Sequence, residues 1–125
     1  MSTVPTVCRT IDAFRVTAAW TESAITWNNQ PFGTTINNPA GGSADDTFTV
    51  GTPTGCTNQA AAYVTGADVT TSVAAFVAGT STNFGWMLRD DVEGSSTART
   101  STFSAKELAT LARAPQLVIT YVVVP

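Results

Sequence analysis

The sequence contains no histidine, and only 12% of its 125 residues are charged. Histidine is the commonest general base near neutral pH and a frequent zinc ligand, so its absence excludes a Ser-His-Asp triad and most zinc sites. Lys106 is also the single lysine. Catalysis would depend on carboxylates or on Lys106, and we expect a protein that is not an enzyme.

Positive charge is scarce as well, with a net charge of −3 and a pI near 4.5. This balance argues against binding to nucleic acid, to anionic membrane surfaces and to polyanionic glycans. No apolar run is long enough to span a bilayer, and residues 1–7 lack the basic start and apolar core of a signal peptide. The expected partners therefore include neither nucleic acid nor membrane.

Hydrophobic residues nevertheless make up 43% of the sequence, enough for the core of one domain over residues 1–125. Solubility depends on Thr, Ser, Asn and Gly, which is typical of secreted all-β modules. The two cysteines, Cys8 and Cys56, are too far apart for a CxxC motif. One disulfide in an oxidising compartment is the preferred interpretation, and two buried free thiols are the alternative.

Alternating apolar residues predict several short strands. In residues 11–18, Phe14, Val16 and Ala18 lie on one face and Arg15 and Thr17 on the other, which predicts a half-buried strand. Further strands are expected over residues 47–50, 60–64, 84–89 and 99–103. Residues 116–124 are apolar on both faces and predict a central strand.

Two segments show helical features instead. Residues 69–78 have helical spacing, with Asp68 as a candidate N-cap and Gly79 as the residue after the C-cap. A helical turn is expected over about residues 105–111, where Lys106 and Glu107 belong to a capping box. These elements predict an all-β, jelly-roll-like β-sandwich with one short helix.

Residues 20–31 are the richest stretch in chemistry, because they hold two of the three tryptophans and a cluster of amides. Trp20 and Trp27 are interpreted as anchors of a corner where the chain leaves a strand, and secondarily as a surface for stacking sugars. Glu22 is expected to be a buried hydrogen-bonding residue paired with Lys106 or an arginine.

The order of five motifs resembles the DNRLRE domain. They are Trp20-Thr21-Glu22 with Ile25-Thr26-Trp27-Asn28 and Pro31; Asp68-Val69-Thr70 with Phe76 and Gly79; Asn83-Phe84-Gly85; Phe103-Ser104 with Lys106-Glu107; and Pro115 with Leu117, Ile119 and Tyr121. The resemblance extends from about Arg9 onward. It implies a jelly-roll module of secreted bacterial or archaeal proteins, related to carbohydrate-binding modules of polysaccharide-degrading enzymes.

The resemblance also implies strands that would precede residues 14–18 and that this sequence lacks. The chain is therefore interpreted as a shortened variant, as the C-terminal part of a larger domain, or as a split domain that pairs with a complementary N-terminal segment. A structural or adhesive spacer is the competing function.

A neutral polysaccharide is the expected ligand, and we expect its binding face on the sheet surface that carries Arg15, Arg89 and Arg99. No cofactor is expected apart from calcium, for which Asp90, Asp91 and Glu93 are candidate ligands through their carboxylate oxygens.

Overall fold

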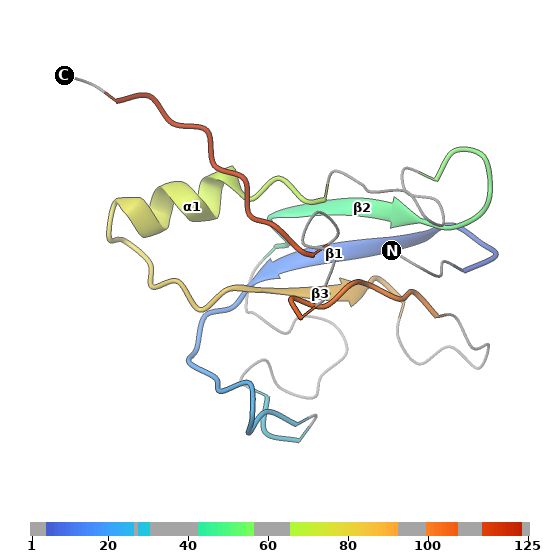
Figure 1. Cartoon of the computed structure of the whole chain (residues 1–125), viewed down its shortest axis with the longest axis horizontal. Helices are drawn as coiled ribbons and strands as arrows, with labels where there is room; N and C mark the ends of the chain where they lie inside the picture. The colour runs from blue at the N-terminus through green and yellow to red at the C-terminus, as the bar shows by residue number, and fades with distance from the viewer. Residues whose placement is uncertain are drawn as a thin grey trace.

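The computed structural model describes residues 5–26, 28–30, 43–56, 66–92, 100–107 and 114–123. Three strands form one antiparallel sheet in the order β2-β1-β3, and a helix lies beyond one end of that sheet (Figure 1). The elements are β1 (Arg9–Arg15), β2 (Asp46–Val50), α1 (Thr70–Val77) and β3 (Trp86–Asp90). The β-rich architecture with one short helix confirms the coarse prediction, whereas the jelly-roll topology stays a prediction.

The central strand β1 has apolar side chains on both of its faces. Ile11 and Ala13 are buried on one side, and Phe14 is buried on the other, because successive residues of a strand point to opposite faces. Ile11 packs with Val50 of β2 and with the half-buried Phe48. The predicted half-buried strand is therefore corrected to a strand with buried side chains on both of its faces.

The helix α1 occupies most of the predicted range. Its N-cap is Val69, one residue later than predicted, but Asp68 still accepts the backbone N–H of Thr70 at 2.9 Å. Hydrogen bonds from the side chain and backbone of Thr70 lower the pKa of Asp68. Asp68 therefore holds the first turn of α1 in place without occupying the cap position itself.

Glycine ends α1 as predicted. Gly79 adopts a φ of +70°, which a residue without Cβ reaches at no steric cost. Its N–H donates to Phe76 O at 3.1 Å, and the N–H of Thr80 donates to Ala75 O at 3.0 Å. These two bonds form a Schellman motif and satisfy carbonyl groups of the last helical turn.

Asp45 joins the helix to the sheet. Its Oδ2 accepts the hydroxyl of Ser72 at 2.5 Å and the indole N–H of Trp86 at 2.7 Å, and Ser72 is fully buried. The ring of Trp86 also packs against Phe76 with centroids 5.6 Å apart and an interplanar angle of 57°. Trp86 is therefore a structural residue at the junction between helix and sheet.

A disulfide joins Cys8 to Cys56 with 5.6 Å between their Cα atoms, which confirms the preferred interpretation of the cysteines. It ties the segment before β1 to the turn that follows β2. A Cβ added at Gly51 would lie 2.7 Å from the carbonyl oxygen of Val7 and 2.8 Å from Sγ of Cys56. Glycine is required at position 51 because the backbone and the disulfide approach it closely.

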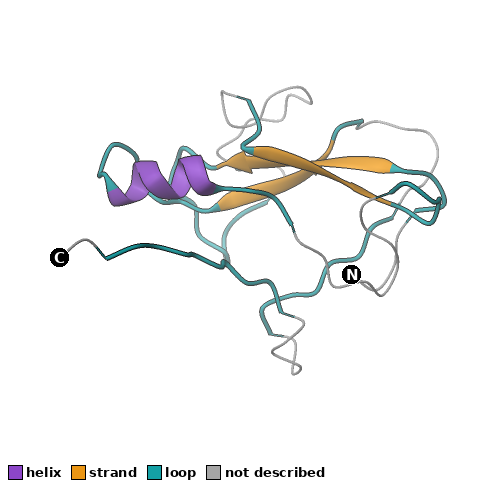
Figure 2. Ribbon diagram, turned by 90° about the horizontal axis from the view of Figure 1, so that it is seen from above, coloured by secondary structure: helices purple, strands orange, loops and turns teal. Residues whose placement is uncertain are grey.

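The predicted central strand at residues 116–124 is wrong for its described part. Residues 115–123 form no strand, are exposed to solvent and run away from the sheet (Figures 1 and 2). A pattern that is apolar on both faces indicates that a segment needs to be buried, but it does not identify the sheet edge to which the segment pairs. Residues 100–103 likewise form no extended strand, with a single bridge residue at Thr102.

Several predictions fall outside the described residues. These are the strand at 60–64, the part of the helical turn at 108–111, and the side chains of Trp27, Glu93 and Arg99. Lys106 and Glu107 lie in a turn.

Candidate functional site

A tight turn follows β1 and holds the tryptophan-rich stretch in place. The N–H groups of Ala24 and Ile25 donate to Thr21 O at 3.0 and 2.9 Å. The Asn29 side chain accepts the N–H of Thr26 at 2.5 Å and donates to Ala24 O at 2.8 Å. Asn29 of the amide cluster therefore forms local hydrogen bonds that shape the corner.

Trp20 at this corner is exposed rather than buried, with 44% of its surface accessible. Its indole N–H donates to the carbonyl oxygen of Phe84 at 2.8 Å, across 64 residues of sequence. One edge of the ring is therefore fixed, while much of the ring remains open to solvent. This hydrogen bond holds Trp20 at the corner, but packing of Trp20 into the core is not observed.

The segment that carries Phe84 is itself shaped by the Asn83-Phe84-Gly85 motif. Gly85 has a φ of +86°, and its N–H donates to Oδ1 of Asn83 at 2.9 Å. The carbonyl of Gly85 accepts the N–H of Val16 at 2.9 Å, just after β1. This bond places Phe84 beside the end of the central strand.

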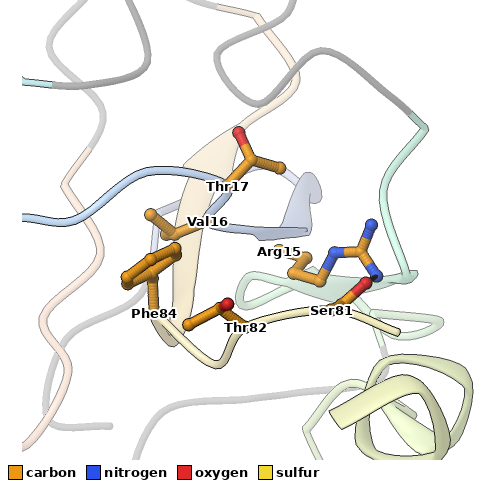
Figure 3. Close-up of a pocket in the computed structure, with 6 residues that line it drawn as sticks. All are labelled: Arg15, Val16, Thr17, Ser81, Thr82 and Phe84. Carbon is orange, nitrogen blue, oxygen red and sulfur yellow. Dashed lines mark hydrogen bonds between the residues drawn. The ribbon is translucent and has the colours of Figure 1, made fainter. Parts of the chain in front are cut away.

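A shallow hollow of about 130 Å³ lies where the end of β1 meets the connection between α1 and β3. We call it the Arg15 hollow, and Figure 3 shows its lining residues: Arg15, Val16, Thr17, Ser81, Thr82 and Phe84. The guanidinium of Arg15 donates to the hydroxyl of Ser81 at 3.3 Å, and the Phe84 ring lies next to Val16. One cation, three hydroxyls and an aromatic ring are thus gathered in one place.

The chemistry of the Arg15 hollow suits a hydroxyl-rich ligand. Hydroxyl groups donate and accept hydrogen bonds, and a guanidinium donates hydrogen bonds in a fixed planar geometry. An aromatic face contacts the apolar C–H groups of a ligand. Pockets that enclose a drug-sized ligand measure roughly 300–1,000 Å³, so this hollow receives only an edge of a ligand. Such a surface fits part of an extended chain better than a small molecule that must be enclosed.

Glu22 forms an ion pair with Lys106, and Lys106 also lies 3.5 Å from Oε1 of Glu107. The expected partner of Glu22 is therefore confirmed, but the expected burial is wrong, because both side chains of the pair are mostly exposed. Hydrogen bonding to Glu22 raises the pKa of Lys106. The pair links the tryptophan corner to residues 100–107.

The three predicted arginines do not share one sheet face. Arg15 pairs with Trp86 across the sheet, whereas Arg89 pairs with Asp12, three residues earlier on β1. Side chains an odd number of positions apart on a strand point to opposite faces, so Arg15 and Arg89 are on opposite sides. Arg99 lies outside the described residues.

A second hollow, of about 210 Å³, lies along β3. We call it the Leu88 hollow, and its lining residues are Ile11, Leu88, Arg89, Asp90, Ser101 and Phe103. Leu88 and Phe103 are exposed there, at 48% and 41%. Its lining is mixed, because Arg89, Asp90 and Ser101 are polar or charged whereas the other three residues are apolar.

Asp90 and Asp91, two of the three residues predicted to hold calcium, face a guanidinium instead. Arg9 is buried, and it donates to both carboxylate oxygens of Asp90 and to Oδ1 of Asp91 at 3.2 Å. Burial acts to raise the pKa of Asp90, but hydrogen bonds from Arg9 and from the Val92 N–H lower it on balance. The described residues contain no group of three or more carboxylate, cysteine or histidine side chains placed to hold a metal ion.

Sequence reasoning missed Ser81, Thr82 and the position of Phe84 in the lining of the Arg15 hollow. Phe84 was expected on the apolar face of a strand that begins at residue 84, but β3 begins only at Trp86. The signal was available in the Asn83-Phe84-Gly85 motif, since an Asn two residues before a Gly favours a turn.

The chain is thus a β-rich domain with a shallow polar and aromatic hollow on its surface. The family model of carbohydrate-binding module family 96 matches residues 3–121, and the chain therefore belongs to that family. The match does not confirm the resemblance to the DNRLRE domain, which stays a prediction. No curated protein and no solved structure matches the chain. Among the described residues, no helix has the length and apolar content needed to cross a membrane.

Proposed function

We propose that the chain is a non-catalytic, extracellular module that binds a polysaccharide at the Arg15 hollow as part of a larger secreted or surface protein. One observation supports this proposal most strongly. Trp20 is exposed and is fixed by its hydrogen bond to Phe84 O, and Phe84 lines a hollow that offers hydroxyls and a guanidinium. A spacer domain does not require an exposed aromatic ring beside convergent polar groups. Membership of family 96 supports carbohydrate as the ligand.

The lining of the hollow supports binding without hydrolysis. Glycoside hydrolysis generally requires two carboxyl groups that face each other across the scissile bond. The six lining residues of the Arg15 hollow include no carboxylate. Hydrogen bonding and stacking are the interactions that this set of side chains supplies.

We propose a neutral polysaccharide, because the net charge of −3 disfavours polyanions at long range. Arg15 is nevertheless the one charged residue of the hollow, so uronic acid polymers belong in the same test. The disulfide is the feature of the chain that favours an oxidising, extracellular compartment.

Affinity electrophoresis against neutral and uronic acid polysaccharides, with calcium and with a chelator, tests the proposal. We expect at least one neutral polymer to retard the chain, with or without calcium. Arg15→Gln should reduce this retardation strongly, while Arg89→Gln serves as a matched control on the opposite face of the sheet. Retardation by no polymer would overturn the proposal, and equal losses for the two variants would remove the Arg15 hollow as the site.

A further inference from the structure

The Leu88 hollow carries the same kinds of groups as the Arg15 hollow. Phe103 in its lining is exposed, with 41% of its surface accessible, and Ser101 brings a hydroxyl. An aromatic ring contacts the apolar C–H groups of a sugar, and a hydroxyl exchanges hydrogen bonds with sugar hydroxyls. The chemistry of this second hollow therefore also suits part of a polysaccharide.

Asp90 adds a hydrogen-bond acceptor to the Leu88 hollow, and 28% of its side chain is accessible. A carboxylate has about four lone-pair sites. Arg9 uses one of them on Oδ2, and Arg9 and the Val92 N–H use two on Oδ1. Oδ2 therefore retains a site for a sugar hydroxyl, while the pair with Arg9 holds the carboxylate in place. The negative charge of Asp90 favours a neutral sugar over an anionic one at this hollow.

The pairing of β1 with β3 places one polar residue of each hollow on the same face of the sheet. Arg15 pairs with Trp86, and Ile11 pairs with Asp90. Paired residues share a face, and so do residues an even number of positions apart on a strand. Arg15 and Asp90 therefore share a face and lie about 14 Å apart along β1, because Ile11 precedes Arg15 by four residues. Arg89 points to the opposite face and is not among the groups assigned to the ligand.

An ion pair connects the segments that carry the exposed aromatic rings of the two hollows. Glu22 of the tryptophan corner pairs with Lys106, which follows Phe103 by three residues. Trp20 and Phe103 are exposed to nearly the same extent, 44% and 41%. The two rings therefore lie on segments that are joined to each other as well as to the sheet.

We infer that the Leu88 hollow is a second subsite for the polysaccharide chain that binds at the Arg15 hollow. This inference rests on the proposed function, because the second hollow extends a site that the first one begins. The hollows measure about 130 and 210 Å³, and each is smaller than the roughly 300–1,000 Å³ of pockets that enclose a ligand. Each hollow therefore holds one part of the ligand. One sugar ring does not span about 14 Å, so the ligand is an extended stretch of several sugars that runs along β3.

Affinity electrophoresis of the whole chain, in gels that contain hydroxyethyl cellulose, galactomannan or xylan, tests the second subsite. Phe103→Ala should weaken binding to the polymer that retards the unmodified chain about tenfold. Tyr121→Ala is the matched control, because Tyr121 is an exposed aromatic residue, 77% accessible, that lines neither hollow. It should be retarded like the unmodified chain, and circular dichroism should show that both variants fold.

Competition with oligosaccharides of the same polymer tests whether one ligand chain crosses both hollows. A hexasaccharide should displace the unmodified chain from the polymer more effectively than a trisaccharide, because only the longer ligand fills both subsites. Phe103→Ala should remove most of this difference. Equal competition by the two lengths with the unmodified chain, or a difference that persists in Phe103→Ala, would overturn the inference.

The outcomes also separate this inference from the proposed function. If Arg15→Gln loses retardation while Phe103→Ala is retarded like Tyr121→Ala, the second subsite is overturned and the Arg15 hollow stands as the binding site. If none of the three polymers retards the unmodified chain, the second subsite is overturned together with the proposed binding of a neutral polysaccharide.

Discussion

The indole N–H of Trp20 and the carbonyl oxygen of Phe84 lie 2.8 Å apart, and this bond connects the corner after β1 to the connection that precedes β3. Both segments border the end of the central strand. The bond orients an exposed ring next to the Arg15 hollow, so the corner and the hollow form one surface. A ring held at one edge loses less conformational entropy on binding than a freely rotating one.

Substitutions of Trp20 should separate the contribution of its ring to polysaccharide binding from the contribution of its hydrogen bond. Trp20→Ala should weaken polysaccharide binding about tenfold or more, whereas Trp20→Phe, which keeps a ring without the N–H, should have a smaller effect. The free energy of unfolding should change by no more than about 1 kcal/mol, because the ring is exposed and its bond is to one carbonyl. Affinity electrophoresis and urea unfolding measure the two quantities. Unchanged binding by Trp20→Ala would exclude Trp20 from the ligand surface.

Asp45 is expected to contribute more to stability than any exposed carboxylate of the described chain. Asp45→Ala leaves the buried Ser72 hydroxyl and the Trp86 N–H without an acceptor. The expected loss is about 1–4 kcal/mol, since a buried donor without a partner costs about 1–3 kcal/mol and the half-buried Trp86 N–H costs less. Ser72→Ala removes only one donor and should cost about 1 kcal/mol. Urea unfolding followed by tryptophan fluorescence checks both values, and equal losses would contradict the shared-acceptor arrangement.

Local signals in the sequence predicted local structure well. Helical spacing and Gly79 located α1, and alternation located β1 and β2, because these patterns reflect contacts within a few residues. Long-range relations were harder. Whether Arg15 and Arg89 share a face depends on the pairing register between β1 and β3, and a strand pattern alone does not determine that register.

The candidate site could be predicted only in part for the same reason. Arg15 and Trp20 were identified because their residue types are informative in themselves. Ser81 and Thr82 are ordinary loop residues, and they become part of a site only because α1 ends at Val77 and the following loop turns back toward β1. Residues 117–123 show the opposite case. Their sequence indicates that they need to be buried, but it does not identify the surface that covers them.

Reduction of the disulfide should destabilise the domain. The bond closes a loop with a sequence separation of 48, and cross-links of this kind contribute about 3–4 kcal/mol, mostly by restricting the unfolded chain. The double variant Cys8→Ser with Cys56→Ser should lose a similar amount. Thermal unfolding with and without reductant measures the effect. The double variant is the control for reductant itself, since it should show no further change.

Two carboxylates of the sheet should have opposite effects on the pH dependence of stability. The pKa of Asp90 is lowered in the folded state, so its contribution is present above the ordinary carboxyl pKa of about 3.9 and is lost as the pH falls through the lower folded value. Burial, and then the nearby charge of Asp91, raises the pKa of Asp12. Ionised Asp12 therefore destabilises the fold, and this cost appears as the pH rises through its raised pKa.

Substitutions to asparagine test the opposite directions of these two pKa shifts. Asp90→Asn should lower the melting temperature at pH 7 and flatten its decline below about pH 4, because the Arg9–Asp90 pair no longer titrates. Asp12→Asn should raise the melting temperature at pH 7 and bring no gain at pH 3, where the native Asp12 is already protonated. Thermal unfolding across this pH range gives the measurement. A stabilising Asp90→Asn, or an Asp12→Asn that destabilises at pH 7, would contradict the assigned environments of the two carboxylates.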